Sequence, residues 1–255
     1  KHISQLIFLF AVVILTPFSV NAQNVLEEAT KAYQDENYEK AIELLENEVN
    51  LQRGKGYESS DLYYNLGNAY FRDNEVAKAI LNYERALLVD PGDRDIRHNL
   101  NYARTKIEDK IVGIDPFFLQ SWFDSVQNLQ SSNAWAKLSV VLFLVFMISL
   151  SLFFFTNKVS VKKITFYTGI VALIFVIFAN IFSFRQKNKI MQRNTAIIMA
   201  GAVSVTNSPD SSANEVFTLH SGSKVKINKT DGNWMEIEID NGSVGWITRD
   251  KVEII

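Results

Sequence analysis

The sequence predicts a multidomain chain with an all-α repeat solenoid, a two-helix transmembrane hairpin and a C-terminal all-β barrel. Three observations support this division. Apolar and small residues recur at helical spacing up to Pro91, two apolar runs of almost membrane-spanning length follow, and strand-like alternation begins after residue 194. We therefore expect two soluble parts attached to one membrane anchor.

The first residues have the order of a secretory signal. Lys1 and His2 precede the apolar stretch 3–13, and the tripeptide Val20-Asn21-Ala22 offers a small-residue exit. This pattern predicts a signal peptide over residues 1–22, cleaved after Ala22. If it were not cleaved, it would remain as an anchor and the next domain would still be exported.

Residues 23–112 are predicted to form helix-turn-helix repeats. Small residues stand where two helices must approach closely, and a proline ends the unit. The pattern comprises Tyr63, Leu66, Gly67, Tyr70, Ala79, Tyr83, Ala86 and Pro91. It resembles the tetratricopeptide repeat.

A weaker copy of this unit precedes it, and half a copy follows. The weaker copy comprises Ala29, Ala32, Tyr33, Ala41 and Leu45. The last helix starts after Pro91-Gly92-Asp93 and is expected to run to about Lys110. A final half repeat with a polar outer face is a usual cap for a solenoid.

The resemblance implies a concave groove lined by the first helix of each repeat. That groove would present Tyr33, Tyr64, Asn68, Phe71 and Tyr102. Aromatic rings give a large contact area, and Asn68 offers both a donor and an acceptor to a peptide backbone. Our hypothesis is peptide capture; the alternative is that these side chains pack between helices or are covered by the next segment.

Residues 136–156 and 164–184 are each long and apolar enough for a transmembrane helix, and the short connector 157–163 makes them a hairpin. A hairpin places both soluble parts in one compartment. With an exported N-terminal domain, the three connector lysines face the cytoplasm, as the positive-inside bias expects. The prediction is an inner-membrane protein with both soluble domains in the periplasm, although four basic residues within 185–193 oppose that orientation.

The linker 113–135 is too apolar for a flexible tether. Asp115-Pro116 is predicted to open a helix whose apolar stripe either lies at the membrane interface or docks onto the last repeat helix. The stripe comprises Leu119, Trp122, Phe123, Val126 and Leu129. Within the hairpin, Asn180 indicates helix pairing through a hydrogen bond.

Residues 194–255 change to strand periodicity. Ile237 and Ile239 alternate with acidic residues, and Asn241-Gly242 suits a tight hairpin turn, so we expect a barrel of five or six strands. Leu219-His220-Ser221-Gly222, Gly232-Asn233-Trp234 and Gly245-Trp246-Ile247 resemble the bacterial SH3 domain. Some such domains bind cell-wall peptides through exposed aromatic rings; the alternative is that Trp234 and Trp246 belong to the core.

No pattern predicts catalysis, a cofactor or a metal site. The chain has no cysteine, and its three histidines have no acidic partner nearby in the sequence. Residues 23–113 carry 18 acidic against 12 basic residues, which disfavours nucleic-acid binding. The basic residues lie beside the predicted membrane helices, where anionic lipid headgroups would attract them.

The order of these parts resembles the BatE family, the tetratricopeptide-repeat members of the bacterial aerotolerance (Bat) operon. The motifs Leu66-Gly67, Phe217-Thr218-Leu219-His220 and Gly245-Trp246-Ile247 carry the resemblance. It implies a non-enzymatic scaffold that assembles with Bat membrane proteins bearing von Willebrand factor A domains and with a MoxR-type ATPase, linked to oxygen tolerance and envelope stress.

The leading hypothesis is thus a membrane-anchored adaptor for protein partners. The first alternative is a cell-wall module in which residues 194–255 bind peptidoglycan. A sensor that signals across the membrane is disfavoured, because the short connector leaves almost no cytoplasmic surface for an output.

Overall fold

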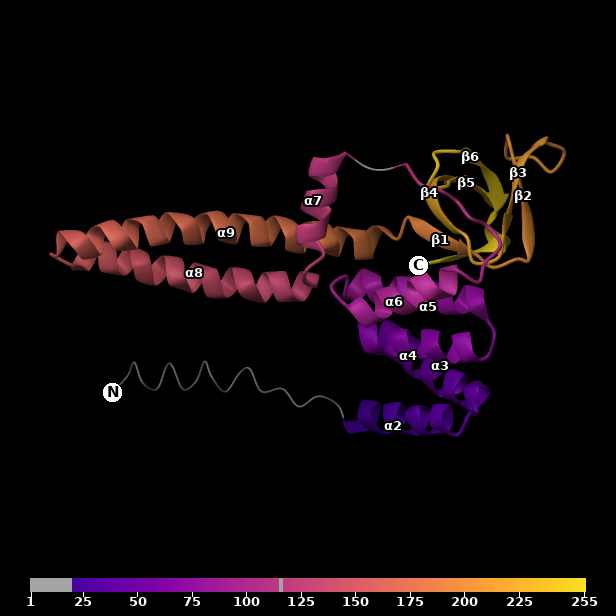
Figure 1. The fold of residues 1–255 in the computed structure, drawn as a ribbon, viewed down its shortest axis with the longest axis horizontal. Helices are drawn as coiled ribbons and strands as arrows, with labels where there is room; N and C mark the ends of the chain where they lie inside the picture. Colours follow the sequence, from indigo (N-terminus) through magenta and orange to yellow (C-terminus); the bar gives the residue numbers. More distant parts are fainter. Residues whose placement is uncertain (1–19, 115–116) are drawn as a thin grey trace.

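The computed structural model describes residues 20–114 and 117–255, with side chains from Val25 onward. The helical repeats and the β-domain lie together at one end of a long helical hairpin (Figure 1). The predicted signal peptide falls outside the described residues except for its last three, Val20 to Ala22, which form the first turn of a helix.

Five helices stack in antiparallel order to form the repeat region (Figure 1). They are α2 (Val20–Gln34), α3 (Tyr38–Gly54), α4 (Ser60–Arg72), α5 (Val76–Val89) and α6 (Arg94–Arg104). Asn37, Ser59 and Asp93 each accept a hydrogen bond from a backbone N–H in the first turn of α3, α4 and α6, which satisfies donors that have no partner within the helix.

Close packing of α4 on α5 explains the small residues of the repeat motif. A Cβ atom on Gly67 would lie 2.7 Å from the ring of Tyr83, and Ala79 is fully buried at the same contact. A larger side chain at either position would force the helices apart. The predicted helix-turn-helix unit is therefore present.

The last repeat helix is shorter than predicted. α6 ends at Arg104 rather than near Lys110. Lys110 Nζ donates to the carbonyl oxygens of Thr105 and Ile107, which belong to a non-helical turn. Asp109, in the same turn, bonds to the β-domain, and this tertiary contact replaces the last helical turns.

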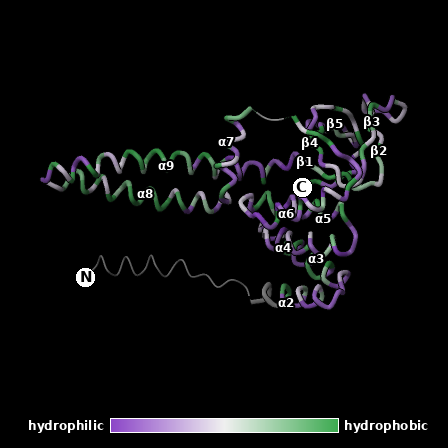
Figure 2. Tube along the Cα trace, in the orientation of Figure 1, coloured by the Kyte–Doolittle hydropathy of each residue, from purple (hydrophilic) through white to green (hydrophobic). Residues whose placement is uncertain are grey.

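Two helices form the hairpin: α8 (Ser132–Phe155) and α9 (Val159–Gln192). Both are long and apolar enough to cross a membrane, and Figure 2 shows the apolar residues concentrated along them. Their boundaries differ from the prediction. Ser131 caps α8, which begins at Ser132, four residues before the predicted start at 136. The connector shrinks to residues 156–158, and α9 continues eight residues beyond 184.

Small and uncharged polar residues hold α8 against α9. Asn180 Nδ2 donates to Ser139 Oγ at 2.6 Å, so the predicted pairing role of Asn180 is met within the hairpin. Ser132 Oγ donates to the Ser183 carbonyl oxygen at 2.9 Å. These contacts leave most of the large apolar side chains of α8 and α9 on the outside.

The linker helix α7 (Phe118–Gln127) crosses the hairpin near its domain end (Figure 1). Phe123 packs edge-on against Phe182 of α9, with ring centroids 5.0 Å apart. Leu119 and Trp122 are exposed, at 55% and 65%. Leu129 lies beyond the end of the helix, so the predicted stripe is shorter than expected and contacts α9 through one ring.

The β-domain is an antiparallel sheet of seven strands in the order β3-β2-β6-β5-β4-β1-β7. They are β1 (Thr195–Ile198), β2 (Ala202–Thr206), β3 (Glu215–His220), β4 (Lys224–Asp231), β5 (Trp234–Glu238), β6 (Val244–Thr248) and β7 (Val252–Ile254). β3 and β7 end the hydrogen-bonded order, so this sheet is open rather than a closed barrel.

The sequence pattern missed β1. Ala196 and Ile198 enter the core of the sheet, whereas Ile197 between them enters the core of the repeat helices. A strand buried on both faces does not alternate between apolar and polar residues, which is the signal used to find the other strands.

The repeats and the sheet share an apolar contact. Ile197 and Ile255 are at most 2% exposed and pack among the repeat helices. Gly222, with φ +91, lies so close to Ile107 that an added Cβ would be 2.5 Å from its Cγ2 atom. We call this contact and the charged contacts around it the repeat–sheet joint.

Charged groups surround the joint. Arg85 of α5 donates to Glu253 Oε1 at 2.9 Å, and Glu84 accepts from Lys224 at 2.7 Å and from Arg104. Arg193, at the end of α9, bonds to both Glu58 of the repeats and the Ile255 carbonyl oxygen. The joint therefore connects the repeats, the sheet and the apolar helical hairpin.

Candidate functional site

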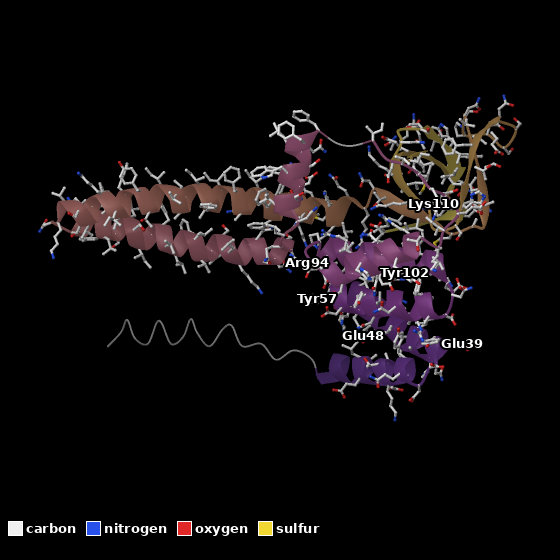
Figure 3. The ribbon with its side chains drawn as sticks, in the orientation of Figure 1. Glu39, Glu48, Tyr57, Arg94, Tyr102 and Lys110 are labelled. Carbon is white, nitrogen blue, oxygen red and sulfur yellow. The ribbon has the colours of Figure 1, made fainter. Side chains whose placement is uncertain are left out.

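The predicted groove residues come from the first helix of each repeat. Tyr33 lies on α2, Tyr102 on α6, and the other three lie on α4 at positions 64, 68 and 71. Spacings of four and three residues place those three on one face of α4. We call this surface the concave face; Tyr102 is labelled in Figure 3.

Asn68 is at the centre of a hydrogen-bond network. Its Oδ1 accepts from Tyr83 Oη at 2.8 Å and from Asn99 Nδ2 at 2.9 Å. Asn99 Nδ2 also donates to Tyr64 Oη at 3.1 Å. Burial raises the pKa of Tyr83, which keeps its hydroxyl protonated as the donor.

This network changes what Asn68 can offer a ligand. Its acceptor atom is already used within the protein, whereas Nδ2 has no partner among the described residues. A ligand carbonyl oxygen can be bound by that amide, but a ligand N–H must find another acceptor.

Phe71 and Tyr102 form an aromatic pair with ring centroids 5.5 Å apart. Phe71 is half-buried, Tyr102 is 51% exposed, and Lys106 Nζ lies 5.0 Å from the Tyr102 ring centroid. An exposed ring that packs against a second ring gives a rigid contact surface for apolar or planar groups.

Tyr33 stands at the other end of the concave face. Its ring meets Tyr38 edge-on at 5.4 Å, and burial raises the pKa of its hydroxyl. Beside it is a cavity of about 70 Å³, room enough for a small side chain or a few waters. The cavity is lined by Leu26, Ala29, Thr30, Tyr33, Leu45, Asn65 and Asn68.

The structure thus brings Tyr64 and Asn68 into one network, Phe71 and Tyr102 into one pair, and Tyr33 beside the Asn68 cavity. Asn99 was not among the predicted groove residues. It lies three residues before Tyr102 on α6, and that helical spacing is the signal that would have placed it on the same face.

A second surface with partly exposed aromatic residues lies on the β-domain. Trp234 and Trp246 are each half-buried, and neither belongs to the buried core cluster of the β-domain. Lys229 Nζ lies 5.1 Å from the Trp246 ring centroid. Both rings therefore lie outside the buried core cluster, and part of each ring is accessible to solvent.

His220 has an acidic partner that its neighbours in the sequence do not reveal, because folding joins residues 111 positions apart. Its Nδ1 is 2.7 Å from Asp109 Oδ1, and Asp109 also accepts from Ser223 Oγ and the His220 backbone N–H. Ser223 donates to the carboxylate and not to the imidazole, so this is not a nucleophile–base arrangement.

No group of three or more His, Cys, Asp and Glu side chains suited to a metal ion occurs among the described residues. His220, Asp109 and Ser223 instead belong to the joint, where their hydrogen bonds fasten the turn after α6 to the sheet.

Comparison with known families agrees with the two folds. Residues 60–93 match the tetratricopeptide repeat, and residues 201–253 match the bacterial SH3 domain. No curated protein matches the chain. The matched repeat contains the α4 side of the concave face, and the matched SH3 domain contains both tryptophans; both families are typically interaction modules rather than enzymes.

Proposed function

We propose that this protein is a membrane-anchored, non-enzymatic adaptor whose concave face binds a peptide segment of a protein partner. The observation that most supports this proposal is the partly exposed ring pair Phe71–Tyr102. The same face carries Asn68 Nδ2, an amide donor without a partner among the described residues. The rings supply contact area and the amide supplies one directed hydrogen bond, a combination that suits a peptide.

The proposed location is the bacterial inner membrane, with both soluble domains in the periplasm. The repeat–sheet joint supports a shared compartment because the two domains contact each other directly. Arg185 pairs with Asp124 and Arg193 with Glu58, so two of the basic residues that oppose this orientation have partners within the protein. A topology reporter fused after Ile255 tests it, and a cytoplasmic signal would contradict it.

The proposed partners are Bat membrane proteins with von Willebrand factor A domains and a complex containing a MoxR-type ATPase, in a role linked to aerotolerance and envelope stress. The support is the order of parts: tetratricopeptide repeat, two apolar helices and bacterial SH3 domain.

The test is to crosslink the full chain to its partners, purify it in detergent and measure the amount of partner recovered with it. Tyr102→Ala removes the most exposed ring of the concave face, and Tyr57→Ala, at 69% exposure outside it, is the matched control. We expect about tenfold less partner with Tyr102→Ala, the scale of a binding hot spot, and no change with Tyr57→Ala. Equal recovery by both variants would refute the concave-face proposal.

A second candidate function is peptidoglycan binding by the SH3 domain. The observation that favours it is the accessible part of Trp246 beside Lys229. Sedimentation of the full chain with purified sacculi tests it. Trp246→Ala and Lys229→Ala are expected to reduce the sedimented fraction while Tyr102→Ala leaves it unchanged; no enrichment with the unaltered chain excludes this function.

A further inference from the structure

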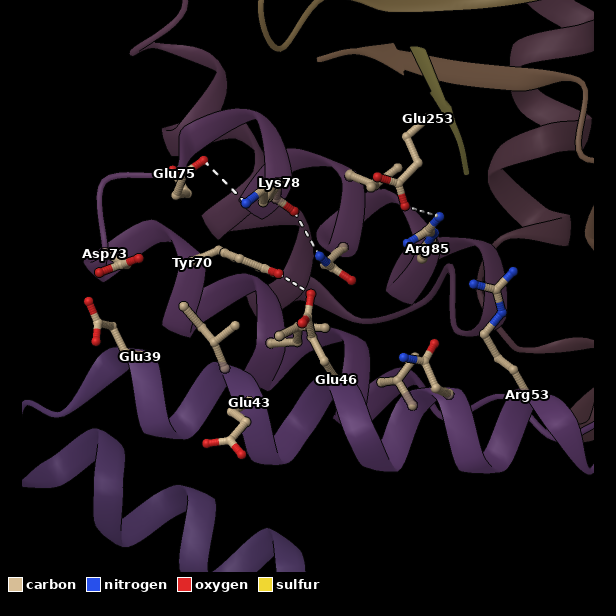
Figure 4. Close-up of a pocket in the computed structure, with 16 residues that line it drawn as sticks. Glu39, Glu43, Glu46, Arg53, Tyr70, Asp73, Glu75, Lys78, Arg85 and Glu253 are labelled. Carbon is tan, nitrogen blue, oxygen red and sulfur yellow. Dashed lines mark hydrogen bonds and ion pairs between the residues drawn. The ribbon is translucent and has the colours of Figure 1, made fainter. Parts of the chain in front are cut away.

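A second groove lies between α3 and α5, the second helices of their repeats (Figure 4). Leu66 and Tyr70 of α4 contribute to its lining, and Glu253 of β7 lies at the joint end. The volume is about 470 Å³. We call it the α3–α5 groove; none of the five concave-face residues lines it.

One end of this groove carries carboxylates without cationic partners. Glu39 of α3 and Asp73 at the end of α4 face each other in Figure 4, and neither has a hydrogen bond or ion pair from its side chain among the described residues. Glu75 nearby is paired with Lys78 at 3.7 Å, and Glu46 accepts from the Tyr70 hydroxyl. Two unpaired carboxylates at one end of a groove attract a cationic side chain.

The middle of the groove holds two buried polar atoms without partners. Asn82 is 2% exposed; its Nδ2 donates to the Lys78 carbonyl oxygen, but its Oδ1 accepts nothing in the described part of the chain. Arg85 is 8% exposed; its terminal nitrogen bonds to Glu253 and to the Ile254 carbonyl oxygen, but its Nε–H donates to nothing there. An unsatisfied buried polar atom costs about 1–3 kcal/mol, so such atoms require an explanation.

The two atoms are complementary to a peptide backbone. Asn82 and Arg85 are three residues apart on α5, which places them on the same face of the helix, and both line the groove. One is an acceptor and the other a donor. An extended chain presents N–H and C=O groups alternately and can satisfy both.

We propose that the α3–α5 groove binds an extended, basic peptide segment of a partner protein. The backbone N–H of the segment donates to Asn82 Oδ1, and a backbone carbonyl accepts from Arg85 Nε. A lysine or arginine side chain lies between Glu39 and Asp73. Because the groove and the concave face are formed by different residues, the adaptor can hold two segments at once.

The experiment measures binding of a defined probe to the full chain in detergent. The probe is a fluorescent, acetylated and amidated octapeptide of alternating lysine and alanine, titrated at physiological salt. We expect saturable binding, and no binding of the same peptide with glutamine in place of lysine. Absence of saturable binding of the lysine probe overturns the proposal.

The acidic end is tested with two charge-matched double variants. Glu39→Gln with Asp73→Asn is expected to raise the Kd by about three- to tenfold, the range of two weak ion pairs. Glu27→Gln with Glu28→Gln removes two charges from exposed positions of α2 outside the groove and is expected to leave the Kd unchanged. An equal rise with both pairs indicates general charge attraction and refutes the site.

The proposed contacts with the peptide backbone are tested by altering first the protein and then the probe. Asn82→Leu keeps the branched shape of the side chain and removes the unpaired Oδ1 acceptor together with the Nδ2 donor to the Lys78 carbonyl. We expect weaker probe binding and unchanged recovery of the concave-face partner, and the thermal midpoint checks that the variant folds. If that variant does not fold, a probe with N-methylated backbone amides gives the same test with the unaltered protein. Equal binding of the methylated and unmethylated probes refutes backbone recognition.

Discussion

The two principal contacts of this molecule are built from different chemistry. In the hairpin, α8 and α9 meet through Ser139–Asn180, Ser132–Ser183 and the small Gly169, which lies against Ser149. In the repeat–sheet joint, buried isoleucines are surrounded by ion pairs. The two sets of contacts perform the same task of holding distant segments together.

The difference follows from the solvent. In the proposed membrane location, lipid provides no hydrophobic drive for the two apolar helices to associate, so close approach of small residues and short hydrogen bonds must hold them together. In water, apolar burial favours the joint, and charges at its edge fix its geometry. The comparison predicts that salt, pH and polar substitutions act on the joint far more than on the hairpin.

Asp109→Ala is the substitution with the largest expected effect on the joint. It leaves Ser223, which is 1% exposed, and the His220 N–H without their acceptor. The expected cost is about 3 kcal/mol, seen as a lower thermal midpoint and faster hydrogen exchange at the joint. Asp210→Ala is the control, since the Asp210 side chain accepts only from nearby Ser212 in the described part of the chain; an equal loss in both variants would contradict the role of Asp109.

Gly222→Ala tests the apolar half of the joint. The new methyl group would meet Ile107 Cγ2 at 2.5 Å on a backbone with φ +91, and we expect a cost of about 2 kcal/mol. Gly232→Ala is matched to it, because Gly232 has φ +56 but nothing within 4 Å of the added Cβ. The difference between their unfolding free energies isolates the contact with Ile107. No difference would show that the joint is loose there.

The joint is expected to be most stable in mildly acidic solution. The Asp109 hydrogen bond raises the pKa of His220 above its usual 6.5, so this contribution is full below 6.5 and is lost as pH rises through the raised value. Partial burial acts to raise the pKa of Asp109, but hydrogen bonds from His220 and Ser223 lower it overall below 3.8; its contribution is present above 3.8 and lost below the lowered value.

Thermal midpoints measured from pH 3 to pH 9 check this window. We expect a maximum between about pH 4 and pH 6.5 and a decline toward pH 8, smaller than the effect of either joint substitution because His220 is partly exposed and solvent screens it. His220→Gln should remove the decline on the alkaline side. If the thermal midpoint of His220→Gln still declines toward pH 8, the decline belongs to another titrating group.

Asn180→Leu is the smallest expected perturbation. It removes the bond to Ser139, and hydrogen bonds between membrane helices contribute about 0.6 kcal/mol on average. Disulfide crosslinking of Ser149→Cys with Gly169→Cys, measured with and without Asn180→Leu and at two salt concentrations, reports the hairpin contact. A large or salt-dependent loss would show that the hairpin and the joint are not as different as their contacts indicate.

The parts of the fold that depend on local pattern were predictable. The spacing of Gly67, Ala79 and Pro91 identified the repeat, and the length of the apolar runs identified the hairpin. β1 was missed because both of its faces are buried, and the contact of His220 with Asp109 was missed because sequence separation hides it.

The candidate site was predictable in outline and not in detail. Helical spacing placed Tyr64, Asn68 and Phe71 on one helix face, since that depends on α4 alone. The use of the Asn68 acceptor by Tyr83 and Asn99 depends on how three helices pack, which no periodicity reveals. The α3–α5 groove was not foreseen for the same reason: α3 and α5 contribute separate residues, and β7 contributes Glu253.

The 34 residues of α9 form one unbroken helix that ends where Arg193 contacts both soluble domains. At 1.5 Å per residue the helix is about 51 Å long, about 20 Å more than the hydrocarbon thickness of a bilayer. Only residues 193 and 194 separate α9 from β1, so in the proposed membrane location the helix length would set the height of the two proposed peptide-binding surfaces above the lipid. Under the proposed function, a partner anchored in the same bilayer would have to expose its binding segment at that height, so distance from the membrane would select partners in addition to sequence.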